Sequence, residues 1–130
     1  MTDQTAYETL AKLLKTDPGN AALLVDTAEA ALDARQPDAA EELLVRAAEA
    51  GAMGPRETNL AAIAALQRRD FPVAAARLVT LMEAGEDAPG LRYNLAWARA
   101  NAGDQTGALA VLDDATALAL PQAATLRIGL

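Results

Sequence analysis

The chain has no cysteine and no histidine, and only 3% of its 130 residues are aromatic. Without cysteine it can form no disulfide framework and carries no thiol chemistry. Without histidine it lacks the commonest general base and metal ligand of proteins. The sequence also contains no glycine-rich phosphate loop and no plausible nucleophile–base pair. We therefore expect a protein that is not an enzyme and that uses no cofactor and no metal.

Positive charge and long apolar runs are also scarce. The net charge is −7, with 11 basic residues against 18 acidic ones, which argues against nucleic acid or an anionic membrane surface as the partner. No stretch approaches the length of a membrane span, and residues 1–20 have no apolar signal-peptide segment. The sequence predicts a cytoplasmic protein, with the periplasm left open if the chain belongs to a longer exported protein.

What the chain does contain is alanine and a regular series of prolines. Alanine is the best helix former, and proline is tolerated in the first turn of a helix but breaks its interior. Five prolines stand at nearly even intervals, at Pro18, Pro37, Pro55, Pro72 and Pro89. Asn20, Asp70 and Asp104 stand where a helix N-cap is needed. This spacing predicts six full helices in a row, with partial helices at both ends.

The small and apolar residues show a second, longer period of about 34 residues, within the range typical of repeat proteins. Three registers repeat at that interval, namely Ala28/Ala62/Ala96, Ala40/Ala74/Ala108 and Leu44/Leu78/Leu112. Ala6 and Leu10 extend the last two registers towards the N-terminus. These positions are predicted to form the helix–helix core. The prolines halve the same period, which indicates a helix–turn–helix unit.

A unit of this length, with a second helix of the form A-x3-L, resembles the tetratricopeptide repeat. The resemblance implies an all-α fold, an α-solenoid of antiparallel helix hairpins wound into a right-handed superhelix, although other α-solenoids share the period. It divides the single domain 1–130 into a half repeat at 3–20, full repeats at 21–54, 55–88 and 89–122, and the start of a further helix at 123–130. The large aromatic positions of the family's first helix hold other residues here, such as Leu24, Thr58 and Arg92.

The same resemblance implies where a partner binds, because the first helices of such repeats line a concave groove. By register, the groove residues are Val25, Asp26, Glu29 and Asp33 in the first repeat, Arg56, Asn59, Ile63 and Gln67 in the second, and Tyr93, Asn94, Trp97 and Asn101 in the third. Leu95 and Ala96 are then turned into the core. The family's clamp for a chaperone's C-terminal carboxylate is excluded, because its lysine and arginine positions hold other residues.

Trp97 is the chain's only tryptophan, and it follows Tyr93 by one helical turn. A tryptophan within an alanine-rich hairpin would overpack the core, whereas in a groove it offers a large contact area to a partner. We therefore interpret Trp97 as a partner contact. Tyr93 has two interpretations that stay open, a partner contact or a brace against the preceding repeat.

The leading functional prediction is a non-catalytic module that binds a peptide or helical segment in the groove. The expected partner is apolar with some basic character. Two alternatives stay open, a small acidic chaperone for secreted bacterial proteins and an accessory domain of a larger protein. The apolar C-terminal residues Leu126, Ile128 and Leu130 are unsuited to a cap. They predict either a piece of a longer array or self-association through that end.

Overall fold

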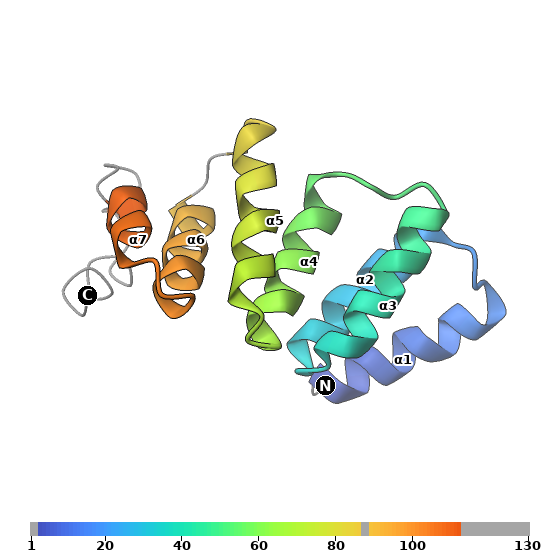
Figure 1. The fold of residues 1–130 in the computed structure, drawn as a ribbon. Helices are drawn as coiled ribbons and strands as arrows, with labels where there is room; N and C mark the ends of the chain where they lie inside the picture. Colours follow the sequence, from blue (N-terminus) through green and yellow to red (C-terminus); the bar gives the residue numbers. More distant parts are fainter. Residues whose placement is uncertain (1–2, 87–88, 113–130) are drawn as a thin grey trace. The chain divides into compact units, whose positions relative to one another are not determined.

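The computed structural model describes residues 3–86 and 89–112, which form seven helices and no strand (Figure 1). The helices are α1 Asp3–Thr16, α2 Ala21–Asp33, α3 Pro37–Glu49, α4 Pro55–Gln67, α5 Phe71–Glu83, α6 Pro89–Asn101 and α7 Gln105–Leu112. Helices α2, α4 and α6 begin at the interval of the alanine registers, and so do α1, α3, α5 and α7. The predicted all-α helical repeat is confirmed. The predicted helix at 123–130 lies outside the described residues.

The helix starts follow from proline and capping residues. Proline occupies the first turn of α3, α4 and α5, where its missing N–H costs no hydrogen bond. Asn20 caps α2, since its Oδ1 accepts from the backbone N–H of Leu23 at 3.1 Å, and Asp104 caps α7 through the N–H of Gly107 at 2.9 Å. Asp70 stands at the N-cap position of α5, as predicted, but its side chain forms no capping hydrogen bond. There Phe71 and the following proline begin the helix without it.

The turns between helices repeat with the same period as the helices. Arg35, Arg69 and Gly103 all have positive φ, at 59°, 63° and 92°, and they stand at equivalent positions. Gly51 and Gly85, at 101° and 95°, mark the other turn of the unit. After Arg35, the N–H of Gln36 donates to the carbonyl of Ala31 at 2.8 Å, as in a Schellman motif. Two arginines therefore hold a backbone conformation that costs least for glycine.

The chain divides into two compact units, residues 1–69 with α1 to α4, and residues 70–130 with α5 to α7. In the first unit, α2 packs against α1, α3 and α4; in the second, α6 packs against α5 and α7. The alanine registers are confirmed as core: Ala28, Ala40, Ala62, Ala74, Ala96 and Ala108 are all 0% exposed. Among the leucines of the third register, Leu78 is 0% and Leu44 is 8% exposed. Small side chains at these positions let neighbouring helices pack closely.

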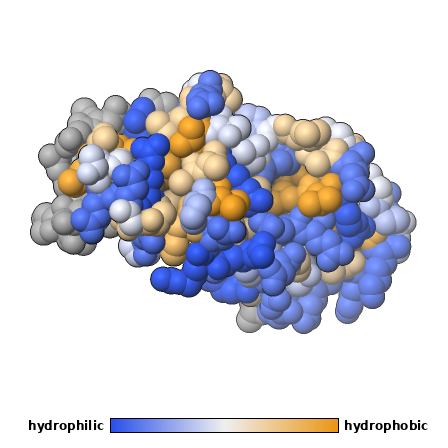
Figure 2. All heavy atoms as spheres, viewed as in Figure 1, coloured by the Kyte–Doolittle hydropathy of each residue, from blue (hydrophilic) through white to orange (hydrophobic). Residues whose placement is uncertain are grey.

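The surface of the first unit is mostly hydrophilic in the view of Figure 2, with a hydrophobic patch over α3. The exposed large apolar residue of α3 is Val45, at 59%. None of the helices among the described residues is long and apolar enough to cross a membrane.

Candidate functional site

The first helices α2 and α4 bring three of the predicted groove residues into one ion-pair cluster. Arg56, at the start of α4, places Nη2 2.9 Å from Asp26 Oδ1 and 2.5 Å from Glu29 Oε2, both on α2. All three side chains are about half exposed. The hydrogen bonds to Glu29 and then Asp26 raise the pKa of Arg56 above its ordinary value. The cluster is therefore a charged surface that remains open to solvent.

The other predicted groove residues of α2 and α4 differ in their exposure. Gln67, at the end of α4, donates from Nε2 to the backbone carbonyl of Leu32 at 2.9 Å, which ties α4 to α2. Its Oε1 is buried and has no hydrogen-bond partner within the described part of the chain. Asn59 and Ile63 are half-buried, and Asp33 is exposed at the end of α2. Among these residues Asp33 is the most open to a partner, while Gln67 already has a structural role.

The prediction that Val25 lines the groove is wrong. Its side chain is 2% exposed and belongs to the core cluster with Leu24 and Ala28. The repeat register placed Val25 next to the buried stripe of α2. Because α2 packs against three other helices, the apolar face of α2 is wider than the family pattern implies. Val25 therefore offers no surface to a partner.

In the second unit, α6 carries the aromatic part of the predicted groove. Trp97 is 38% exposed, whereas Leu95 and Ala96 are 1% and 0% exposed, as expected for core residues. Tyr93 and Asn94 are half-buried, and Asn101 is exposed. Asn101 Nδ2 donates to the carbonyl of Trp97 at 2.8 Å, so one donor of this amide is already used within α6. Trp97 is thus the large apolar side chain that α6 presents to solvent.

One further feature escaped the sequence analysis. A pocket of about 370 Å³ opens between α1 and α3, with Tyr7, Lys15 and Arg46 among its lining residues. Thr27 and Glu29 are two residues apart on α2, so their side chains leave the helix on nearly opposite sides. Thr27 lines the pocket and Glu29 belongs to the ion-pair cluster. The pocket is therefore separate from the α2/α4 surface. The sequence signal that points to this pocket is the repeat register of α1 and α3, which are both second helices of the unit.

No group of three or more carboxylate, histidine or cysteine side chains able to hold a metal ion occurs among residues 3–86 and 89–112. Residues 4–62 match the model of the tetratricopeptide repeat family. This span holds α1, α2, α3 and the first half of α4, and the match confirms the resemblance drawn from the period and the A-x3-L pattern. No curated protein matches the chain.

Proposed function

We propose that the chain, whose residues 4–62 match the tetratricopeptide repeat family, a class that generally binds other proteins, is a non-catalytic module whose first helices bind a peptide or helical segment. The proposal treats each unit by itself. The residues assigned to binding are Asp26, Glu29, Asp33, Arg56, Asn59, Ile63 and Gln67 in the first unit, and Tyr93, Asn94, Trp97 and Asn101 in the second. The cytoplasm is the compartment in which we expect this binding.

The exposure of Trp97 is the observation that carries the proposal. Its neighbours Leu91, Leu95 and Ala98 on α6 are at most 8% exposed, while Trp97 is 38% exposed. A helix with an adequate core gains nothing from leaving its largest apolar side chain in water. Tryptophan in such a position is typical of binding hot spots, because it adds a large contact area at little cost in conformational entropy. We infer that a partner's apolar side chain covers Trp97.

The chemistry of α2 supports a basic residue in the partner. Within the described part of the chain, Arg56 is the cation that pairs with both Asp26 and Glu29, and Asp33 lies one turn beyond Glu29. Three carboxylates and one guanidinium leave this surface with a net negative charge. A lysine or arginine of the partner would balance that charge and would be steered towards it in solution. The proposed partner segment is therefore apolar with some basic character.

The single tryptophan allows a direct test of the proposal. The probe is an amphipathic 16-residue peptide with leucines on one face and lysines on the other, and its matched control carries glutamate in place of lysine. We expect the lysine peptide to shift the emission of Trp97 to the blue and to protect it from a soluble quencher. Amide signals of Glu29 and Arg56 should also move in a nuclear magnetic resonance titration. If neither peptide changes Trp97 fluorescence or these amides at millimolar concentration, the proposal fails.

The secretion-chaperone alternative makes a different prediction for the same surface. A chaperone of apolar exported segments would bind many unrelated apolar peptides and would keep them soluble. A specific interaction module would discriminate strongly between them. Comparing the affinities of the lysine peptide and of a scrambled peptide of the same composition distinguishes these two functions, because only the specific module loses affinity on scrambling.

A further inference from the structure

The pocket between α1 and α3 combines an apolar floor with a charged mouth. Leu14 and Leu43, 5% and 7% exposed, and the fully buried Thr27 form the floor. The hydroxyl of Thr27 donates to the carbonyl of Leu23 at 2.6 Å, so this floor offers no unsatisfied polar donor. The volume of about 370 Å³ is close to the lower limit of small-molecule sites. An apolar side chain therefore suits the floor better than a polar group does.

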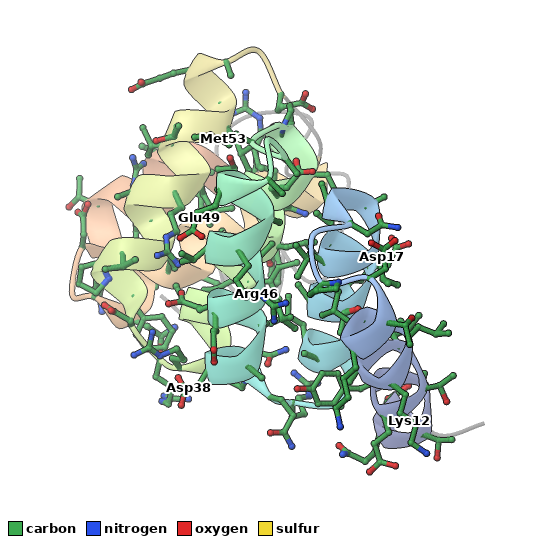
Figure 3. The ribbon with its side chains drawn as sticks, turned by 90° about the vertical axis from the view of Figure 1, so that its right-hand side faces the viewer. Lys12, Asp17, Asp38, Arg46, Glu49 and Met53 are labelled. Carbon is green, nitrogen blue, oxygen red and sulfur yellow. The ribbon has the colours of Figure 1, made fainter. Side chains whose placement is uncertain are left out.

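Two cations stand at the mouth of this pocket, one on each of the helices that form it. Lys15 lies in the last turn of α1 and Arg46, labelled in Figure 3, in the last turn of α3. Arg46 Nη2 donates to the carbonyl of Pro18 at 3.3 Å, and neither cation forms an ion pair with a carboxylate of the described residues. Glu42 lines the same mouth and opposes an incoming anion. The mouth nevertheless carries a net positive charge in a chain whose total charge is −7.

The second unit contains a pocket at the equivalent register with a different mouth. It lies between α5 and α7 and has a volume of about 290 Å³. Its residues Val79, Met82, Leu95 and Val111 stand two repeats after Ala11, Leu14, Thr27 and Leu43 of the first pocket. The position of Lys15 is taken there by Glu83, which offsets the charge of Arg99, the cation of that lining. The apolar floor is thus a property of the repeat, whereas the positive mouth belongs to the α1/α3 pocket.

We propose that the α1/α3 pocket is a second binding site, which takes a leucine-like side chain of a partner protein together with an adjacent carboxylate. The side chain fills the floor over Thr27, and the carboxylate lies between Lys15 and Arg46. An acidic residue next to the anchor would match these cations, as a basic residue would match the acidic α2/α4 surface. The site is independent of the groove, because Thr27 and Glu29 leave α2 on nearly opposite sides.

The experiment uses the whole chain and two short probes, acetyl-GLLEG-amide and acetyl-GLLKG-amide, in a nuclear magnetic resonance titration at low ionic strength. We expect the glutamate probe to move the amide signals of Leu14, Thr27 and Leu43, with an affinity about fivefold higher than that of the lysine probe, as one exposed ion pair allows. Lys15→Glu should weaken binding of the glutamate probe about fivefold, and Glu42→Gln should strengthen it. Sodium octanoate is the third probe, since a fatty acid carries the same chemical groups.

Lys12→Glu is the matched control, because Lys12 lies on the same helix but does not line the pocket. It should change the affinity by less than about twofold, as expected for a screened distant charge. An equal loss of affinity for the glutamate probe in Lys12→Glu and Lys15→Glu would overturn the site. Amide signals of Val79 and Leu95 in the α5/α7 pocket that shift as much as those of the α1/α3 pocket would also overturn it. Tighter binding of octanoate than of the glutamate probe would mean that the pocket takes a small organic anion and not a protein partner. Shifts confined to Glu29, Arg56 or Trp97 would refute the pocket but not the groove. Shifts confined to the pocket would support the pocket and would not bear on the groove, which the lysine peptide tests.

Discussion

Arg56 and Glu29 are 27 residues apart in the chain, yet a hydrogen bond of 2.5 Å joins their side chains across α4 and α2. The same nitrogen of Arg56 also donates to Asp26 at 2.9 Å. One cation therefore neutralises part of an acidic surface that we assign to binding. This arrangement makes Arg56 a competitor of any basic residue that a partner brings to Asp26 and Glu29.

Replacing Arg56 by glutamine should strengthen the binding of the lysine peptide, because both carboxylates then become available to it. The free energy of unfolding should fall by less than about 1 kcal/mol, since the ion pairs are half exposed and screened by water. The measurements are the dissociation constant, its dependence on salt, and a denaturant titration.

The matched control for this change is Arg68→Gln. Arg68 also pairs with two carboxylates, Asp38 at 3.1 Å and Glu41 at 2.9 Å, but none of these residues belongs to the binding surface. The Arg68→Gln variant should lose a similar small amount of stability without any gain in affinity for the lysine peptide. Binding that rises equally in both variants would point to the overall negative charge instead of a local competition.

The pKa of Arg56 gives a further expectation for the dependence of stability on pH. The carboxylates raise this pKa above an ordinary value that already lies far above neutral pH. The raised pKa stabilises the folded state at every pH below the pKa of this group in the unfolded chain. That stabilisation is lost only as the pH rises through the pKa of the folded state. Arg56 is therefore charged throughout the working range. Between pH 6 and 9, roughly a range in which an arginine side chain stays charged, the stability difference between wild type and Arg56→Gln should be constant in urea titrations.

The alanine register can be tested with two changes on the same helix. Ala28 is 0% exposed in the core of the first unit, so Ala28→Leu should lower the free energy of unfolding by about 1–3 kcal/mol through overpacking. Ala22 is exposed on α2, and Ala22→Leu should stay within about 0.5 kcal/mol of wild type. Equal losses at the two positions in denaturant titrations would contradict the assignment of Ala28 to a tightly packed contact.

The turn after α2 offers a stabilising change. Arg35 has a φ of 59°, a conformation that costs an ordinary side chain about 1–2 kcal/mol. Arg35→Gly removes that strain but makes the unfolded chain more flexible, so the net gain in stability should be about 0.5–1 kcal/mol. Gly51→Ala is the complementary control, because its φ of 101° should make alanine destabilising although no atom lies within 4 Å of the added Cβ. A melting temperature that falls in Arg35→Gly would show that contacts of the arginine outweigh the strain.

The sequence predicted the helices and the alanine core because both depend on local, repeated signals. Proline in the first turn and buried alanine recur with the period of the repeat, so each instance supports the others. Val25 and Gln67 were less predictable, since their burial and hydrogen bonding depend on how α2 and α4 pack together. The pairing of Arg56 with Asp26 and Glu29 joins two repeats and has no counterpart in a single-repeat pattern. The α1/α3 pocket is likewise formed by two second helices that are not neighbours in sequence.

Trp97 decides whether α6 presents a binding surface. At 38% exposure the indole is partly covered, so its emission in the protein alone should lie between that of buried and fully solvated tryptophan, and a soluble quencher should reach it. Trp97→Ala should weaken binding of the lysine peptide by about 2 kcal/mol or more, the usual loss for an aromatic anchor. The cost of Trp97→Ala in stability should stay below the roughly 3–5 kcal/mol typical of a fully buried aromatic.

Leu95→Ala supplies the contrast, because Leu95 is 1% exposed and its replacement should cost about 2–5 kcal/mol of stability. At temperatures where the Leu95→Ala variant remains folded, its peptide affinity should be unchanged. If Trp97→Ala instead unfolds the chain and leaves the affinity of the remaining folded protein intact, then Trp97 is a core residue, and the surface of α6 has no role in binding.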